Sequence, residues 1–339
     1  MDKFRGTASA KELCDTVAEV LKQFDYVPDC QPMSDGGEGF REAFSGEDFA
    51  ALVRGPLGET VSASITLVTN DTGRVAVIES ADAVGRQHLP NPTGEEALAA
   101  SSAGVGELIL AAARLGATSV LLGLGGSATS DGGLGCYEFL CEHGGLPVPV
   151  IAATDVTARF SGARRYALQK GVREGDLALV DGRLAELRSR YLHEQGIDVE
   201  TLERTGAAGG IPGALTALGA SLVGGLDAVV QVVDLASRVE ATDMVITGEG
   251  RFDEGSLEGK VTGGLAALAA GRVPLLLVCG SVQAQAEEQL LARYNNLHFL
   301  DLSAMVGPEA ATRDVVGSIA RVLREALHEA ATTHQRRRA

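Results

Sequence analysis

Apolar side chains recur every three or four positions near the start of the chain, as on one face of an amphipathic helix. The positions that carry this pattern are Leu13, Val17, Val20, Leu21 and Phe24. Ser9 and Glu12 precede them as an S-x-x-E capping box, a signature of a helix N-terminus. The pattern therefore predicts a helix that begins just after Ser9.

A period of two replaces this pattern further along the chain. Residues 60–68 alternate apolar and polar side chains, and residues 74–80 are rich in Val and Ile. The sequence Asp-Thr-Gly at 71–73 separates the two runs and is typical of a turn. These residues are thus predicted to form a β-hairpin, which is an antiparallel feature.

The order strand, glycine-rich loop, helix then occurs twice. An apolar run over 119–123 predicts a buried strand, and the loop 123–133 and a helix to about residue 143 follow it. The second such unit and the elements after it are a strand at 243–247, a loop at 248–253, a helix at about 260–270, strands at 274–279 and 297–302, and a helix at about 308–331. Because strands and helices alternate, the pattern indicates a parallel sheet with helices on both faces.

Composition and charge exclude several classes of protein. The chain has 45 Asp and Glu against 29 Lys and Arg, a net charge of −16, which would repel a nucleic-acid backbone. Its five Cys are scattered without a C-x-x-C pair, as is typical of reduced thiols. No apolar run reaches the ~18 residues of a membrane span, and the start lacks the apolar core of a signal peptide. We expect a cytoplasmic protein that binds neither nucleic acid nor membrane.

Three loops combine glycines with carboxylates, at 34–39, 123–133 and 248–253, and Lys260 follows the last. In an open α/β sheet, ligands bind where such loops leave the strands. Glycines let backbone N–H groups approach an anion, and magnesium would bridge the carboxylates to phosphate oxygens. One loop of this kind is typical of a turn with a helix cap. Three in one chain favour phosphoryl transfer.

Known nucleotide motifs match poorly. Residues 255–261 are one residue short of a P-loop and end in Val. Residues 123–128 match G-x-G-x-x-A after a strand, which leaves a dinucleotide-dependent oxidoreductase as an alternative. The acidic residue expected about 20 positions later is not evident. The six His show no ligand spacing, and the chain has no G-x-S-x-G nucleophile motif.

Several long motifs resemble those of the bacterial glycerate kinases that form 2-phosphoglycerate. They occur in the order that the family has and extend over most of the chain: D-K-F-R-G-T at 2–7, P-M-S-D-G-G-E-G at 32–39, G-V-G-E-L-I at 104–109, G-L-G-G-S-A-T-S-D-G-G at 123–133, T-G-A-A-G-G at 205–210, I-T-G-E-G-R-F-D at 246–253 and G-K at 259–260.

This resemblance implies ATP-dependent phosphorylation of D-glycerate at the 2-hydroxyl, with Mg²⁺. We expect the protein to be a monomer or a homodimer. The resemblance also implies two α/β domains, one inserted into the other. We place a Rossmann-like domain at 1–55 and 235–330, an inserted α/β domain with the β-hairpin at 56–234, and a basic tail at 331–339.

Roles within the motifs follow from side-chain chemistry. Backbone N–H groups of the 123–133 loop and of the helix behind it are expected to hold ATP phosphates. Candidate magnesium ligands, from which the general base would also come, are Asp35, Asp131, Glu249 and Asp253. The catalytic candidates are Asp35, Asp253, Lys260 and Asp131. Candidates for binding substrate or phosphate are Lys3, Arg5, Ser34, Gly36, Gly37, Gly125, Gly126, Ser127, Thr129, Lys170, Glu249 and Arg251.

The chain departs from the family pattern in two places. The family's K-I-V-I-A-P strand before the residue that matches Asp2 is absent, and we expect it to lie upstream of Met1. The family's N-P-L and F-G-P segments are lost between 155 and 171, although Asp155, Gln169 and Lys170 remain. These departures leave a second alternative, a family member that binds ligand without catalysis.

Overall fold

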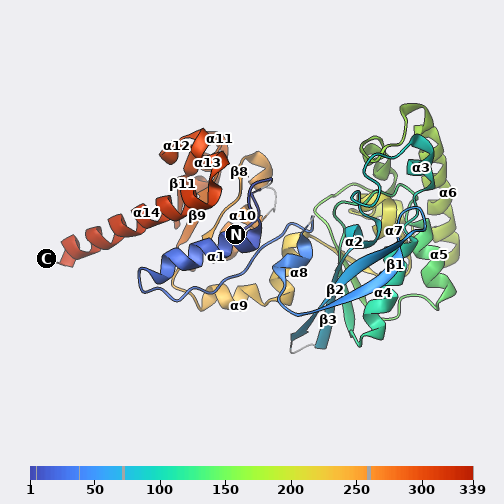
Figure 1. Ribbon diagram of the computed structural model, residues 1–339, viewed down its shortest axis with the longest axis horizontal. Helices are drawn as coiled ribbons and strands as arrows, with labels where there is room; N and C mark the ends of the chain where they lie inside the picture. The colour runs from blue at the N-terminus through green and yellow to red at the C-terminus, as the bar shows by residue number, and fades with distance from the viewer. Residues whose placement is uncertain (5, 38, 71–72, 258–260, 339) are drawn as a thin grey trace. The chain divides into compact units, whose positions relative to one another are not determined.

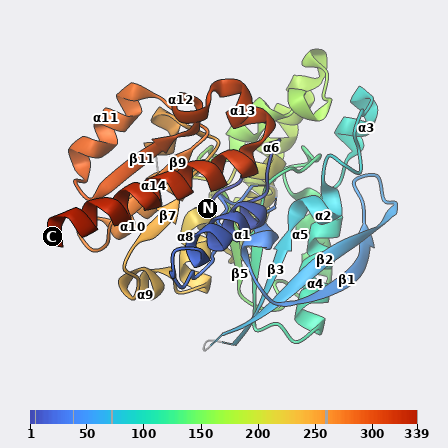
Figure 2. The ribbon, with the colours of Figure 1, turned by 60° about the vertical axis from the view of Figure 1, so that its left-hand side comes forward.

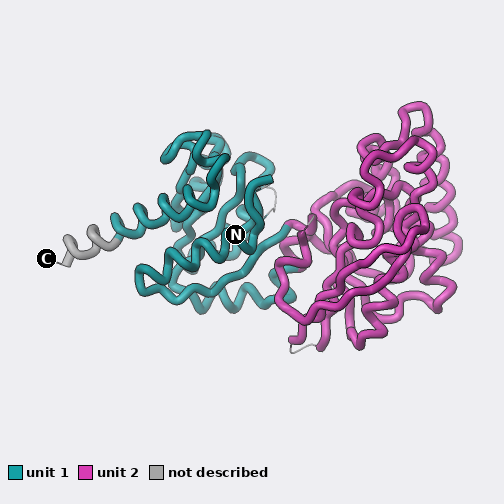
Figure 3. The backbone as a smooth tube through the Cα atoms, in the orientation of Figure 1, with its two compact units in different colours: residues 1–34, 229–339 teal, residues 35–228 magenta. Residues whose placement is uncertain are grey.

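The computed structural model describes residues 1–4, 6–37, 39–70, 73–257 and 261–338, those from 331 onward by their backbone alone (Figure 1). Arg5 and Lys260, two of the candidates from the sequence, lie outside the described residues. The chain divides into two compact units (Figure 3): unit 1 contains residues 1–34 and 229–339, and unit 2 contains residues 35–228. Unit 2 is thus an insertion in the sequence of unit 1.

The limits of the units differ from the domain boundaries that we placed near residues 55 and 235. Strand β1 (Glu47–Arg54) pairs along its whole length with β2 (Thr60–Asn70), so it belongs to the same sheet as the hairpin. The start of unit 2 therefore moves back to Asp35. Its end falls within helix α8 (Gly225–Val232).

Unit 2 is built on one mixed sheet of six strands in the order β1-β2-β3-β4-β5-β6. The first three strands are antiparallel and include the expected hairpin, whereas β3 to β6 run parallel. The remaining strands are β3 (Gly73–Glu79), β4 (Ser119–Gly123), β5 (Val150–Ala153) and β6 (Ser221–Val223). The α/β class with a mostly parallel sheet, expected from the sequence, is confirmed.

Two apolar cores hold unit 2 together. In the first, Val105, Leu108 and Ile109 of α4 pack on strand residues such as Ile78 and Leu122. In the second, long helix α6 packs on Phe160 and Tyr137. The helices of this unit are α2 (Ser80–Val84), α3 (Gly94–Ala99), α4 (Ala103–Arg114), α5 (Leu134–Glu142), α6 (Leu177–Gln195) and α7 (Ile211–Ala217), followed by α8.

Unit 1 contains a parallel three-stranded sheet in the order β11-β9-β7 and a parallel two-stranded ladder of β8 and β10. Its strands are β7 (Val245–Thr247), β8 (Arg251–Phe252), β9 (Leu275–Cys279), β10 (Ser281–Val282) and β11 (Leu297–Asp301). Leu276 and Val278 of the central strand β9 face a core formed with helices α1 (Ala10–Lys22) and α14 (Val315–Arg338). Figure 2 shows these two helices side by side.

The amphipathic helix predicted after Ser9 is α1, and the Ser9 side chain accepts a hydrogen bond from the Glu12 backbone N–H. The single last helix expected at 308–331 is instead two helices, and the second, α14, continues to Arg338 through residues that we assigned to a basic tail. The helix is interrupted at Asp314. The carboxylate of Asp314 accepts a hydrogen bond from the Gly317 N–H and so caps the start of the second helix. The other helices of unit 1 are α9 (Leu235–Glu240), α10 (Val261–Ala269), α11 (Ala284–Arg293), α12 (Leu302–Val306) and α13 (Pro308–Arg313).

The first residues lie beside β7. The backbone N–H of Asp2 donates to the carbonyl of Gly248, and the N–H of Met33 donates to the carbonyl of Met1. The start of the chain thus connects the end of β7 to the segment that leads out of unit 1. Among the described helices, none combines the length and the apolar character needed to cross a bilayer.

Candidate active site

The parallel strands of unit 2 place several motif residues at one edge of the sheet. Strands β3 to β6 run in the same direction, so their carboxyl ends meet at a common edge. Glu79 ends β3, the 123–133 loop follows β4, Asp155 follows β5, and Gly225 follows β6. This edge is where an open α/β sheet binds ligands, and the other features of the site in unit 2 lie around it.

The loop that contains Asp35 packs closely on this edge. Asp35 accepts a hydrogen bond from the Gly37 N–H at 3.1 Å. Gly36 has a φ of +83°, and a Cβ there would lie 3.1 Å from Gly225 Cα and 3.2 Å from the carbonyl oxygen of Ala153. Gly36 is therefore needed both for its backbone conformation and for the close approach.

Glu79, which we did not single out in the sequence, anchors the far end of the same loop. Its buried carboxylate accepts from the N–H groups of Gly39 at 3.2 Å and Arg41 at 2.8 Å. Burial raises the pKa of Glu79, and the two N–H groups oppose this shift. The carboxylate fixes the loop at one end while Gly36 fixes it in the middle.

Asp155 is the second carboxylate at the sheet edge. Its Oδ1 accepts from the Gly225 N–H at 2.9 Å, while Oδ2 is buried and has no hydrogen-bond partner within the described part of the chain. Burial, and to a smaller extent the negative charge of Asp35, raise the pKa of Asp155 to about 6. A carboxylate with an unused buried oxygen is chemically suited to accept a proton or to bind a cation.

Asp131, one of our catalytic and metal candidates, has all of its carboxylate engaged by the protein. Oδ2 accepts from the N–H and hydroxyl of Ser102 at 2.8 and 2.7 Å and from the Gly135 N–H at 3.1 Å, and Oδ1 accepts from the Gly133 N–H at 3.0 Å. The carboxylate therefore caps the N-terminus of α5. These bonds favour a structural role for Asp131, and they occupy N–H groups that we expected to hold ATP phosphates.

Lys170 is a buried cation of unit 2, with only 7% of its surface exposed. Its Nζ donates to Ser127 Oγ at 2.9 Å and to the Thr129 carbonyl at 2.7 Å, so two candidates from the glycine-rich loop contact it directly. Burial lowers the pKa of Lys170 to about 7, and the charge of Asp131 acts in the opposite direction.

A third family-like segment closes around Lys170. Gly209 has a φ of +74°, and a Cβ there would collide with the Thr129 carbonyl and lie 3.1 Å from Lys170 Nζ. The Gly132 N–H donates to the Gly209 carbonyl at 2.9 Å. Segments around 130, 170 and 209 are thus brought together, and Gly125 and Gly126 lie just before them in the same loop.

The remaining candidates belong to unit 1. Asp253 is half-buried, accepts from the Gly255 N–H at 3.0 Å and lies 3.6 Å from the Nε of the exposed Arg251. The Glu249 carbonyl accepts from the Gly280 N–H, and the Lys3 N–H donates to Asp2 Oδ1. Ser34 is buried at the end of the first segment of unit 1.

No three His, Cys, Asp or Glu side chains in the described ranges are grouped so that they could hold a metal ion. Magnesium would therefore bind through one or two carboxylates together with phosphate oxygens and water, as it commonly does. With Asp131 engaged, Asp35 and Asp155 are the carboxylates of unit 2 whose surroundings suit such a role.

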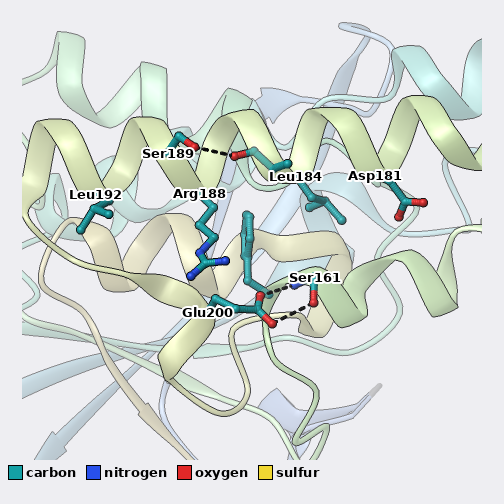
Figure 4. A pocket seen from close by; sticks show the side chains of 9 residues that line it. Ser161, Asp181, Leu184, Arg188, Ser189, Leu192 and Glu200 are labelled. Atoms are coloured by element: carbon teal, nitrogen blue, oxygen red, sulfur yellow. Dashed lines mark hydrogen bonds between the residues drawn. The ribbon is translucent and has the colours of Figure 1, made fainter.

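Two cavities lie away from these residues. A pocket of about 430 Å³ lies beside α6, and its charged side chains already have partners within the protein: Arg188 pairs with Asp198, and Asp181 pairs with Arg164. Glu200 accepts hydrogen bonds from the N–H and hydroxyl of Ser161, as Figure 4 shows. A cavity of about 620 Å³ in unit 1 lies between α1 and β7 and is lined mainly by apolar side chains. Neither cavity is lined by a candidate site residue, so neither locates the site.

The network around Asp131 generates a prediction. Replacing Asp131 with Ala leaves buried donors of Ser102 and of the start of α5 without an acceptor, which should lower the free energy of unfolding by about 2–4 kcal/mol. Urea denaturation measures the change. Asp181→Asn, which alters an exposed ion pair with Arg164, is the control and should change stability by less than about 0.5 kcal/mol. A fully stable but inactive Asp131→Ala variant would contradict the structural role.

Comparison with known proteins identifies the family. The model of the glycerate kinase family matches residues 1–143 and 146–334. A glycerate 2-kinase of Escherichia coli K12 is 34% identical over 327 residues, which cover 83% of this chain and 84% of that protein. A glycerate kinase of Bacillus subtilis 168 is 33% identical over 322 residues, which cover 83% and 84%.

The fold of the chain is also similar to that of a protein of known structure. A crystal structure from Salmonella typhimurium LT2, assigned as a glycerate kinase 2, superimposes with a TM-score of 0.77 at 27% identity and covers 97% of both chains. The resemblance seen in the motifs is thereby confirmed over the whole length of the alignment. The chain belongs to the glycerate kinase family.

Proposed function

We propose that the protein transfers the γ-phosphoryl group of ATP to the 2-hydroxyl of D-glycerate in the presence of Mg²⁺. Membership of the family supports a glycerate kinase. The observation that carries the proposal is the chemistry at one edge of the unit 2 sheet, where the carboxylates Asp35 and Asp155 accompany the buried cation Lys170. Phosphoryl transfer uses groups of this kind, because it depends on positioning and on stabilisation of negative charge.

Magnesium fits the donor set that the structure offers. Asp35 uses one oxygen to accept from Gly37, and its carboxylate would hold the ion together with phosphate oxygens and water. When bound, the ion neutralises negative charge on the phosphate groups. Asp253 and Glu249 of unit 1 stay candidates for the same role, whereas the engaged carboxylate of Asp131 does not fit it.

Asp155 is our proposed proton acceptor for the substrate hydroxyl. A pKa of about 6 makes it a better base than an ordinary aspartate while it is still mostly ionised near neutral pH. Its Oδ1 is oriented by the Gly225 N–H, and its Oδ2 is unpartnered among the described residues. The sequence left the base open among four carboxylates that did not include Asp155.

The direct test is an assay of ADP release with D-glycerate, ATP and Mg²⁺, with ³¹P NMR of the product. We expect turnover that requires all three components, and a product that is 2-phosphoglycerate. Asp35→Asn should lower kcat by about a hundredfold or more at nearly unchanged Tm, because it removes a charge that acts on the phosphates.

Three results would contradict the proposal in whole or in part. Saturable binding of D-glycerate by a folded protein without turnover would favour the non-catalytic alternative. Thermal stabilisation by NAD(P) but not by ATP would favour the oxidoreductase alternative. A 3-phosphoglycerate product would keep the kinase and overturn the assignment of the hydroxyl.

Asp155 generates a second prediction, in which stability and activity change in opposite directions. The pKa of this carboxyl rises from 3.8 to about 6 on folding. Between these values the unfolded chain ionises first, so the wild type loses stability as pH rises, and the loss is complete above pH 6. Asp155→Asn should therefore be more stable than the wild type near pH 8, by about 1–2 kcal/mol after allowance for solvent screening, yet almost inactive.

Urea denaturation near pH 4 and near pH 8, without magnesium, measures this difference. The control is Glu186→Gln, which removes an exposed carboxylate of α6 that plays no part in the pKa shift of Asp155 and should change stability little at either pH. An Asp155→Asn variant that is less stable than the wild type near pH 8, or that keeps full activity, would show that Asp155 is an ordinary structural residue.

A further inference from the structure

The protein does not itself neutralise the positive charge of Lys170. Both hydrogen-bond acceptors of Nζ are uncharged, the hydroxyl of Ser127 and the carbonyl of Thr129. The carboxylate of Asp131 influences Lys170 through space but is bonded to Ser102 and to the start of α5. A buried cation without a bonded counter-charge is costly in a folded protein, unless an anionic ligand pairs with it.

A second cation lies next to this arrangement. Residues 84–86 pair antiparallel with residues 126–128: the Arg86 N–H donates to the Gly126 carbonyl at 3.0 Å, and the Ala128 N–H donates to the Val84 carbonyl at 2.8 Å. Gly85 lies opposite Ser127, the residue that contacts Lys170. Arg86 is thus fixed by its backbone beside the polar contacts of Lys170.

The guanidinium of Arg86 is exposed, and it takes part in none of the ion pairs formed by the described residues. Its charge is close enough to disfavour the protonated form of Lys170. A ligand of opposite charge that contacts both groups would replace this repulsion with attraction. The pair is notable in a chain whose net charge is −16.

An independent observation comes from the loop that contacts the ammonium group of Lys170 and the backbone of Arg86. The hydroxyls of Thr129 and Ser130 are buried, with 0% and 3% of each residue exposed, and neither hydroxyl has a hydrogen-bond partner among the described residues. Buried hydroxyls are seldom left without a partner, because the hydrogen bonds to water that they lose on burial are then not replaced. Their position in the same loop favours a polar ligand at this place.

We propose that Arg86 and Lys170 together bind the carboxylate of a small hydroxy-acid substrate, with Arg86 on the exposed side and Lys170 on the buried side. The ligand identity rests on the proposed function. A carboxylate fits better than a phosphate chain, because the N–H groups at the start of α5 are engaged by Asp131 and the planar guanidinium matches a planar carboxylate. The pair then selects hydroxy acids over uncharged polyols such as glycerol.

The test compares Arg86→Gln, Arg86→Lys and Lys170→Met with the wild type. The control is Arg114→Gln, which removes an exposed arginine from the last turn of α4. Calorimetry measures the binding of D-glycerate without nucleotide, and steady-state kinetics give separate KM values for D-glycerate and ATP.

We expect Arg86→Gln to raise Kd and KM for D-glycerate by about tenfold or more, with KM for ATP changed by less than about twofold. Arg86→Lys should recover part of the loss, Lys170→Met should abolish D-glycerate binding, and Arg114→Gln should behave as the wild type. An Arg86→Gln variant with unchanged binding of D-glycerate would overturn the proposal. So would a rise in KM for ATP alone, which would assign the pair to nucleotide phosphate.

The two arms separate this inference from the proposed function. Turnover of D-glycerate by the wild type with no effect of Arg86→Gln would refute the carboxylate site and leave the kinase intact. Binding of D-glycerate that depends on Arg86, without any turnover, would refute the kinase and support the carboxylate site.

Discussion

The buried ammonium group of Lys170 is the constraint around which the candidate site of unit 2 is arranged. Three segments far apart in the sequence must meet to enclose it: the loop after β4, the short turn that carries Lys170, and the backbone around Gly209. The close approach at Gly209 leaves no room for a side chain. Because burial makes the charge costly, the contacts of Lys170 with oxygen atoms and its access to an anion determine which protonation state the fold stabilises.

The parallel sheet explains why these segments can meet. Four parallel strands deliver their carboxyl ends to one edge, and buried carboxylates then hold the loops in place. Asp131 fixes the start of α5, and Glu79 fixes the end of the Asp35 loop through two N–H groups. The acidic residues at this edge thus fall into two groups. Glu79 and Asp131 have both carboxylate oxygens hydrogen-bonded to the protein, whereas Asp35 and Asp155 can still bind a ligand.

Much of the fold could be predicted from the sequence because its signals are local. The helix after Ser9, the hairpin and the strands before the glycine-rich loops follow from periodicity within short windows. The domain limit near residue 55 differs from the structure because β1 pairs with β2, and this pairing between strands is not visible in a local sequence pattern. The interruption of the last helix at Asp314 depends on one side chain, which caps the start of a new helix.

The site was less predictable because its properties depend on distant partners. The sequence shows that Asp131 lies in a glycine-rich loop. It does not show that the carboxylate accepts hydrogen bonds from Ser102, 29 positions earlier. Burial raises the pKa of Asp155, and Gly225, whose N–H donates a hydrogen bond to this carboxylate, lies 70 positions away in the sequence. Arg86 lies outside every family-like motif, and its position beside the glycine-rich loop depends on backbone pairing that the sequence does not reveal.

The most direct test of this account is the titration of Lys170 itself. The ¹³Cε signal of this lysine, assigned by comparison with Lys170→Met, would be followed with pH in the free protein and with D-glycerate added. We expect a pKa near 7 in the free protein and a clear rise when D-glycerate binds, since an anion stabilises the ammonium form. A pKa close to the ordinary lysine value of 10.5, unchanged by D-glycerate, would contradict this expectation.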